Sequence, residues 1–482
     1  MRDPEVVVVG GGNAGYCAAH AAAERGRRVV LLEKAPRADA GGNSYYTLGS
    51  TRMVHDGLDD LIEVLEPDER HARTEVPPYS AAEFLDDLER VTGGRGDKEL
   101  AEAVVEGSRD AVRWLHGLGL RFQLMYDRQA HEQPDGTFVF WGGSHLSNVD
   151  GGPGLMAVHE QIAARLGVEV RYDSAVTGLL TEGDAVVGVR IGTEELRAES
   201  VVIASGGFQA NAQWRQQYLG DGWQHAKVRG TPYNTGDLIS AALEIGADRG
   251  GDWSTCHSVP WDASYPENES NRALTNRLSR YGYPLGIVVN RRGQRFLDEG
   301  ADFRNYTYAK YGKVILDQPG SVAFQVFDAT SRAMLAAYEY EMPGINPVVA
   351  DSLEELARAM GVDVDGFVRT VREFNASIDT SRPFDPTIKD GRCASVQPVK
   401  SNWAAAIETA PYSAYPVTCG ISFTFGGLRG DVDGRVLDRS DVPIPGLLAC
   451  GETLGGLFSG NYPTGAGLTA GMVIGRRAGA LA

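Results

Sequence analysis

Apolar positions near the N-terminus fall in short continuous runs separated by a helix-prone segment. The first run is Val6-Val7-Val8-Val9, a β-branched tetrapeptide typical of a strand. An alanine-rich stretch follows it, and a second apolar run, Val29-Val30-Leu31-Leu32, ends at Glu33. This order predicts a strand, a helix and a second strand within residues 1–50, the first unit of a nucleotide-binding fold.

Three glycines between the first strand and the helix have the spacing GxGxxG. Gly10 permits a tight turn, Gly12 lets the backbone approach a pyrophosphate, and Gly15 lets the helix pack closely on the strand. The N–H groups that begin the helix face the phosphate charge. Glu33 stands about twenty residues further on, where an acidic side chain can accept hydrogen bonds from a ribose diol. The sequence therefore predicts a dinucleotide site.

The rest of the chain indicates several domains. Helical periodicity covers residues 80–91 and 99–118, a further helix is expected from about 155 to 166, and short strands at 169–172, 186–191 and 200–204. The last of these strands runs into a glycine-rich turn at Gly206, which lets the chain pass close to a cofactor.

Residues 252–410 differ in composition from the rest of the chain, because they contain more Tyr, Trp, Arg and Pro, and we expect several short loops in them. We expect them to form an inserted substrate domain. The predicted fold is therefore α/β, with a Rossmann-type FAD-binding domain (residues 1–251 and 411–482) and an inserted α+β cap domain (residues 252–410).

The C-terminal segment favours FAD over NAD. A strand closes on Gly451-Glu452, and the last helix opens at Gly467-Leu468-Thr469. The ribityl chain and flavin of FAD need a distant part of the chain to return to the site. A helix N-terminus at the pyrimidine edge would stabilise the anionic reduced flavin. The alternative is an ordinary glycine-rich turn before a terminal helix.

The amino-acid composition limits the classes of molecule that the protein is expected to bind. The net charge of −18 argues against nucleic acid or an anionic membrane as partner, although a local basic pocket is still compatible with an anionic substrate. The five cysteines lie far apart, which excludes an internal iron–sulfur cluster or c-type haem on ligand spacing. The predicted first strand leaves no room for a signal peptide, and no apolar run approaches a membrane span, so we expect a cytoplasmic protein.

Four short stretches resemble the flavin-binding landmarks of the fumarate reductase/succinate dehydrogenase flavoprotein superfamily: Gly41-Gly42-Asn43-Ser44, Gly206-Gly207-Phe208, Asn234-Thr235-Gly236-Asp237 and Gly451-Glu452. Within that superfamily, residues 283–309 and 455–463 are similar to the tricarballylate dehydrogenases. Membrane-bound members attach FAD through a histidine before the first landmark, and residues 33–40 contain none, so the resemblance implies noncovalent FAD. The expected cofactor-binding residues are Gly10, Gly12, Asn13, Ala14, Gly15, Glu33, Lys34, Gly41, Gly42, Asn43, Ser44, Ala175, Val176, Ala204, Ser205, Gly206, Asp237, Gly451, Glu452, Gly467, Leu468 and Thr469.

The resemblance also implies catalytic residues. Arg304 takes the place of the arginine that carries the proton in fumarate-reducing relatives. Arginine is a poor base in water because its pKa exceeds about 12. Its guanidinium group would also form hydrogen bonds to a substrate carboxylate and polarise it. The alternative for Arg304 is a structural ion pair with Asp298, Glu299 or Asp302.

Three further residues are expected in the active site. His257 stands where relatives bind a substrate carboxylate, although an isolated histidine is more often a satisfied core group. Arg280 stands near a proton-relay arginine of the relatives, with a longer spacing to the strand. Tyr462 replaces an arginine clamp and gives one neutral hydrogen bond, weaker than an Arg–carboxylate pair by roughly a factor of two. The pocket therefore suits a larger acid, or an acid with one uncharged end.

The leading hypothesis, which rests on this resemblance, is an FAD-dependent oxidoreductase of the tricarballylate dehydrogenase type. It would desaturate a small carboxylic acid, or reduce its C=C bond, by hydride transfer to or from flavin N5. Electrons would leave to a separate acceptor, a quinone or a membrane-associated iron–sulfur protein. A desaturase like the 3-ketosteroid dehydrogenases is the nearest alternative. An FAD-binding electron-transfer subunit without its own small substrate is the second, and a flavin monooxygenase is disfavoured because Gly451-Glu452 replaces its usual GD-type turn.

Overall fold

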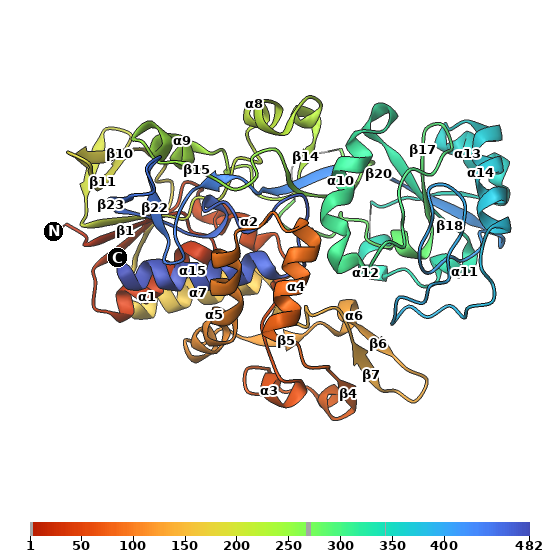
Figure 1. Ribbon diagram of the computed structural model, residues 1–482, viewed down its shortest axis with the longest axis horizontal. Helices are drawn as coiled ribbons and strands as arrows, with labels where there is room; N and C mark the ends of the chain where they lie inside the picture. Colours follow the sequence, from red (N-terminus) through yellow and green to blue (C-terminus); the bar gives the residue numbers. More distant parts are fainter. Residues whose placement is uncertain (1–2, 267–270, 343) are drawn as a thin grey trace. The chain divides into compact units, whose positions relative to one another are not determined.

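The computed structural model describes residues 3–266, 271–342 and 344–482, which divide into two compact units (Figure 1). The first unit consists of the described residues up to Asp221 together with Gly230–His257 and Ser422–Ala482. The second consists of Gly222–Arg229 and Ser258–Ile421. We expected an insert over 252–410. The second unit instead covers Ser258–Ile421, because its longest strand, β20 (Tyr412–Thr424), begins only after residue 410. It also takes in Gly222–Arg229, which we expected in the FAD-binding domain, because Lys227 and Val228 pair with β20.

A six-stranded sheet forms the centre of the first unit, in the order β22-β23-β13-β1-β2-β9. Strand β1 (Val6–Val9) pairs in parallel with β2 (Val29–Leu32) on one side and with β13 (Ser200–Ile203) on the other. Its four valines are buried, as expected of a parallel strand covered on both faces. The edges are completed by β9 (Glu169–Arg171), β23 (Pro443–Ala449) and the antiparallel β22 (Arg435–Leu437). The predicted strand–helix–strand unit is confirmed.

Helix α1 (Asn13–Glu24) follows β1 and packs against α15 (Ala466–Leu481), the last helix of the chain (Figure 1). Their backbones touch: a Cβ added to Gly475 would lie 2.6 Å from the Ala14 carbonyl oxygen, and one on Gly479 only 2.0 Å from that of Ala18. The contacts advance along both helices in the same direction, so the two N-termini lie at the same end. There Asn13 Nδ2 donates to the Leu468 carbonyl oxygen (3.0 Å).

The amphipathic helices lie where the periodicity predicts them. Helix α4 (Ala81–Thr92) starts with a capping box between Ser80 and Glu83. Helix α5 (Lys98–Gly117) contacts α15. Helix α7 (Gly151–Leu166) begins four residues before the expected start, because its first turn contains three glycines and a proline that give no helical signal.

Shorter elements complete the first unit: α2 (Gly42–Tyr45), β3 (Ser50–Thr51), α3 (Leu58–Ile62), β4 (Thr74–Glu75), β5 (Phe122–Leu124), α6 (Tyr126–Gln129), β6 (Ala130–Glu132), β7 (Phe138–Phe140), β8 (Leu146–Asn148), β10 (Val176–Glu182), β11 (Ala185–Ile191), β12 (Glu194–Arg197), α8 (Ala212–Trp214), α9 (Asp237–Glu244), β15 (Arg249–Gly250) and β21 (Gly427–Leu428). Among the residues that the structure describes, no helix is both long and apolar enough to cross a membrane.

The second unit is built on a sheet in the order β14-β20-β18-β17, to which β16 and β19 add by pairing with β20. Apolar side chains of β17 and β18 pack with those of α13 and α14, among them Val289, Val326, Leu356 and Phe367. The elements of this unit are β14 (Lys227–Val228), β16 (Cys256–Asp262, whose first two residues belong to the first unit), β17 (Ile287–Asn290), α10 (Tyr308–Leu316), β18 (Ala323–Phe327), α11 (Ala329–Arg332), α12 (Ala337–Tyr340), β19 (Val348–Ala350), α13 (Leu353–Met360), α14 (Val364–Ala376) and β20.

Substitution of Gly15 tests the close packing of α1 on β1. A Cβ there would lie 1.9 Å from the Gly10 carbonyl oxygen, and the backbone would have to move. We expect Gly15→Ala to lower the free energy of unfolding by about 3 kcal/mol in thermal or urea unfolding. The control is Gly117→Ala at the end of α5, where a Cβ meets nothing within 4 Å. Equal stability of the two variants would contradict the packing.

Candidate flavin site and active site

A pocket with about 850 Å³ of empty space opens at the carboxyl ends of β1, β2 and β13, and we refer to it as the dinucleotide pocket. This is the edge of a parallel sheet at which nucleotides bind in doubly wound folds. Sixteen of the residues expected to bind the cofactor line it: Gly10, Gly12, Asn13, Ala14, Glu33, Lys34, Gly42, Asn43, Ser44, Val176, Ala204, Ser205, Gly206, Asp237, Gly451 and Glu452.

The glycines of this pocket leave room for a large ligand. A Cβ on Gly12 would come no closer than 3.5 Å to another atom, and one on Gly42 no closer than 3.9 Å, so side chains at either position would occupy the pocket itself. Both residues lie at the N-termini of helices, α1 and α2, where the backbone favours anions. The space beside these two glycines and helix N-termini fits a pyrophosphate.

Glu33 lies at the end of β2 with its carboxylate fixed by the backbone. Its Oε2 accepts a hydrogen bond from Gly11 N and its Oε1 one from Ala35 N, both 2.8 Å long. Burial raises the pKa of Glu33, while these hydrogen bonds act in the opposite direction. The carboxylate is therefore held at the wall of the dinucleotide pocket, and its contact with a ribose diol stays a prediction.

A second pocket, which we call the apolar pocket, has about 990 Å³ of empty space and shares Ala14, Asn43, Ser44, Gly451 and Glu452 with the first. Its other walls are aliphatic and aromatic: Leu100, Val104, Phe423, Phe425, Leu454, Leu457, Phe458, Tyr462, Leu468 and Ile474 are among them. Gly467 and Leu468, expected beside the flavin, also line it. Two contiguous pockets, one glycine-rich and one apolar, suit the ADP half and the flavin half of FAD.

Glu452 carries the one ionisable carboxyl among the described residues that line the apolar pocket. Its Oε1 accepts a hydrogen bond from Thr424 N (2.8 Å), and its Oε2 is 3.4 Å from Gln209 Nε2. Burial raises the pKa of Glu452 to about 7, because the hydrogen bonds offset only part of the desolvation. This group therefore changes charge near neutral pH.

His257 and Tyr462 come together in the first unit. The His257 ring is 5.0 Å from the ring of Phe423 and 5.1 Å from that of Tyr462, and Phe458 packs on Tyr462 at 5.0 Å. The Tyr462 hydroxyl accepts a hydrogen bond from Gly467 N (3.2 Å) at the start of α15. The Gly467 N–H thus orients the Tyr462 hydroxyl at the apolar pocket, where the phenol O–H is the group that can donate to a carbonyl oxygen.

Arg304 lies in the second unit with its side chain 22% exposed, 4.0 Å from the buried carboxylate of Glu339. Burial favours the neutral form, but Tyr338 and Glu339 outweigh it and raise the pKa of Arg304 above its usual value. The sequence did not suggest Glu339 as a partner. Of the expected partners, Glu299 pairs with Arg295 at 2.5 Å.

Arg280, also in the second unit, is fully buried and forms an ion pair with Asp262, with Nη2 and Nε 2.8 and 3.2 Å from Oδ2. Its Nη1 donates to the carbonyl oxygen of Arg277 (2.9 Å), and its guanidinium lies over the ring of Tyr340. These contacts give Arg280 a structural role in the core of that unit. Its part in a proton relay stays a prediction.

Four of the expected cofactor residues do not line either pocket: Gly15, Gly41, Ala175 and Thr469. Gly15 packs against Gly10, and the Thr469 hydroxyl is used in hydrogen bonds to the backbone of Arg52. Conversely, Leu100 and Val104 of α5 line the apolar pocket without having been expected there. The helical periodicity of α5 predicts that one face of the helix is buried, but it does not predict which part of the protein that face packs against.

Comparison with known proteins identifies the fold and the cofactor. The family described as an FAD binding domain matches residues 5–468. The chain belongs to this family. It is an FAD-dependent oxidoreductase of the fumarate reductase/succinate dehydrogenase flavoprotein superfamily, in agreement with the two pockets.

Two relatives and one solved structure illustrate which oxidoreductases this chain is similar to. NADH:fumarate oxidoreductase of Klebsiella pneumoniae is 29% identical over 95% of this chain, which spans 45% of that protein's length. The 4-oxocyclohex-2-ene-1-carboxylate 5-dehydrogenase of Sinomonas cyclohexanicum is 27% identical over 98% of this chain and 93% of its own. The open conformation of a flavocytochrome c3 fumarate reductase is 26% identical, with a TM-score of 0.73 over 99% of this chain and 77% of that structure.

The buried carboxyl of Glu452 predicts a pH dependence of stability. Its pKa rises from 4.5 to about 7 on folding, so between these values the folded protein keeps a proton that the unfolded chain releases. The free energy of unfolding of the flavin-free protein should therefore fall with rising pH, by about 2 kcal/mol from about pH 5 to about pH 8. Urea unfolding at both pH values measures this. Glu452→Gln should reduce the fall, and an unchanged pH dependence in that variant would contradict the assignment.

Proposed function

We propose that this protein desaturates a small carboxylic acid, or reduces its C=C bond, at a carbon beside a carbonyl or carboxyl group. Bound FAD supplies the hydride chemistry. The observation that carries the proposal is the apolar pocket, which shares five residues with the dinucleotide pocket and contains the Tyr462 phenol, oriented by the Gly467 N–H. The flavin ring would occupy one part of this pocket and the substrate the part lined by Phe423, Phe458 and Tyr462. There the apolar walls would exclude water from the reacting carbons, and the phenol O–H would donate to one oxygen of the substrate.

The roles of the residues follow from their chemistry. The Tyr462 hydroxyl, oriented by the N–H of Gly467, would donate to the carbonyl or carboxyl oxygen, and His257, packed on the Tyr462 ring, would support that contact. Hydrogen bonds to this oxygen polarise the adjacent carbon–carbon bond and stabilise the negative charge that develops on the oxygen during the reaction. Asn43 and Ser44, which line both pockets, would bind the cofactor where the pockets meet.

Arg304 is proposed as the residue that carries the proton, as the superfamily resemblance implies. Its raised pKa means that the resting guanidinium is charged, so it would donate a proton to the carbanion during reduction more readily than it would accept one. The same charge would attract a substrate carboxylate. Arg280 remains a candidate for relaying the proton.

The substrate class is an acid with one uncharged end. No lysine, arginine or histidine is found among the described residues that line the apolar pocket, so a substrate carboxylate would depend on Arg304 for its counter-charge. A cyclic keto acid has one carboxylate and one neutral carbonyl, and the Sinomonas relative is named for such a substrate. Tricarballylate is the alternative acid from the sequence resemblance. The reduced flavin would pass its electrons to a separate protein, an iron–sulfur membrane-associated protein, or to a quinone.

A desaturase like the 3-ketosteroid dehydrogenases is the second candidate. The observation that favours it is the neutral Tyr462 phenol in an apolar pocket, which would also donate to a ketone of a substrate without any carboxylate. Arg304 distinguishes the two candidates, because a neutral ketone has no need of a cationic partner.

Anaerobic reduction of the bound flavin tests the proposal. We expect the flavin absorbance to bleach with cyclic keto acids or with tricarballylate. Arg304→Ala should slow this bleaching roughly 10²–10⁴-fold, because a positioned proton carrier contributes a factor of that order. The matched control is Arg292→Ala, an exposed arginine on the same unit, which should bleach at the native rate.

Other outcomes lead to other conclusions. Bleaching by 3-ketosteroids with full activity of Arg304→Ala would support the second candidate. If none of these compounds bleaches the flavin, and none of the corresponding unsaturated acids reoxidises the dithionite-reduced flavin, the protein transfers electrons without a small substrate of its own and the proposal is wrong.

A further inference from the structure

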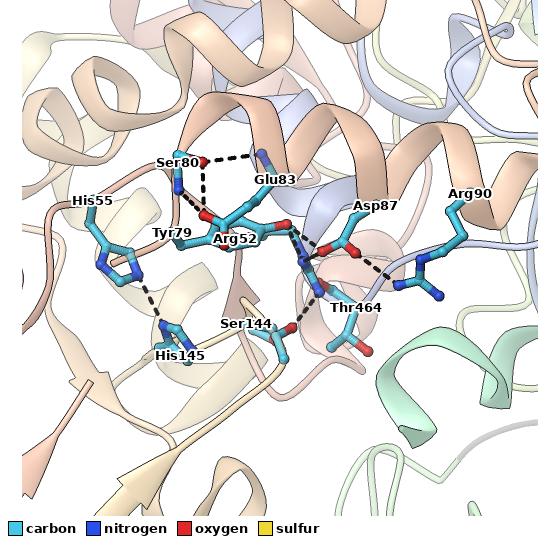
Figure 2. A network of polar contacts seen from close by, with 12 residues as sticks. Arg52, His55, Tyr79, Ser80, Glu83, Asp87, Arg90, Ser144, His145 and Thr464 are labelled. Atoms are coloured by element: carbon cyan, nitrogen blue, oxygen red, sulfur yellow. Dashed lines mark hydrogen bonds and ion pairs between the residues drawn. The ribbon is translucent and has the colours of Figure 1, made fainter. Parts of the chain in front are cut away.

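A fully buried arginine links four separate segments of the first unit (Figure 2). Arg52 follows β3, and its Nη1 donates to Asp87 Oδ2 of α4 (3.0 Å) and to the hydroxyl of Tyr79. Its Nη2 donates to the carbonyl oxygen of Gly142 (3.0 Å) and its Nε to that of Thr464 (2.8 Å). The planar fork of a guanidinium makes these contacts in three directions at once, which a lysine ammonium on its single stem does not reproduce.

The backbone of Arg52 is tied to the same C-terminal region. Its N–H donates to Thr469 Oγ1 (3.1 Å), and that hydroxyl lies 2.6 Å from the Arg52 carbonyl oxygen. A Cβ added to Gly465 would lie 2.9 Å from Arg52 N, so the chain passes closely here. Side chain and backbone of one residue thus fix both Thr464 and the first turns of α15.

These contacts hold one end of the segment that carries Tyr462, residues 459–465, which we call the Tyr462 loop. The other end is held by residues just before His257: Ser459 Oγ donates to Asp252 Oδ2 (2.6 Å), and Gly460 N to Thr255 Oγ1 (2.9 Å). Tyr462 therefore lies between two anchors. Glycines at both anchors, Gly460 and Gly465, give the loop little stiffness of its own.

We propose that Arg52 is a positioning residue that sets the place of the Tyr462 hydroxyl and of Gly467 N in the apolar pocket. Arg52 does not itself line that pocket, so it acts through the Tyr462 loop and α15. The inference rests on the proposed function only for the statement that Tyr462 holds the substrate. That Arg52 orders the loop is a separate statement, which can be tested without substrate.

Arg90 provides a matched control. It pairs with the other oxygen of the same carboxylate, Asp87 Oδ1 (2.8 Å), as Figure 2 shows, but its side chain is 46% exposed. Arg90→Met therefore removes a cation from Asp87 and leaves the contacts of Arg52 with Thr464 and Gly142 in place.

Hydrogen exchange measured by mass spectrometry on the FAD-loaded protein tests the ordering of the loop. In Arg52→Lys the ammonium keeps a charge near Asp87 but loses the fork, so we expect the amides of residues 459–467 to exchange about 10-fold faster than in the native protein. Thr469→Val, which removes one hydroxyl at nearly constant volume, should act in the same direction and decides the matter if Arg52→Lys does not fold. Arg90→Met should exchange at the native rate. Native exchange in both Arg52→Lys and Thr469→Val, or equal acceleration in Arg90→Met, would overturn the proposal.

A double-mutant cycle tests whether the ordering acts through Tyr462. The measured quantity is kcat/KM for the acid that bleaches the flavin of the native protein. Tyr462→Phe should lower this kcat/KM about 10-fold in the native background, which is the effect of one hydrogen bond. In the Arg52→Lys background it should lower kcat/KM less than about 2-fold, because the hydroxyl is already misplaced there. The Arg90→Met background should retain the full effect. Additive losses would show that Arg52 is merely structural and would overturn the inference. If Tyr462→Phe is fully active in the native background, the proposed substrate contact is wrong, and the exchange rates alone then decide whether Arg52 orders the loop.

Discussion

The first unit depends on the direct backbone contact between α1 and α15, two helices from opposite ends of the chain. Small residues make this contact possible: a side chain on Gly475 or Gly479 would overlap the carbonyl oxygens of α1. Because the helices run in the same direction, their N-termini meet at one place, where Asn13 holds the Leu468 carbonyl. One N-terminus faces the dinucleotide pocket and the other the apolar pocket. The packing of two helices thus fixes where both halves of FAD would lie.

The residues proposed for chemistry come from both units. His257, Tyr462 and the pocket walls belong to the first unit, and Arg304 and Arg280 to the second. Strands β16 and β20 each contain residues of both units. Arg280 and Asp262 neutralise each other in the core of the second unit, whereas Arg304 keeps a partly exposed side chain. Of the two arginines, Arg304 is therefore the better candidate for contact with substrate.

The sequence predicted those parts of the site that depend on local order. The strand, glycine turn and helix of residues 6–24 and the helix α4 follow from neighbouring residues, and the structure confirms them. The sequence did not predict that Leu100 and Val104 line the apolar pocket. It also gave no sign that Arg304 pairs with Glu339, or that Arg52 donates a hydrogen bond to Thr464. Each of these contacts joins residues distant in sequence or lacking a motif. An apolar helical face or a lone arginine does not indicate its partner until the chain is folded.

The flavin content of the purified protein tests the central claim most directly. If the two contiguous pockets bind FAD without a covalent link, the protein should be yellow and contain one FAD per chain. Acid denaturation should release all of this flavin into solution, and the refolded chain should take it up again. A colourless protein that takes up no FAD, or flavin that stays with the denatured chain, would contradict the account.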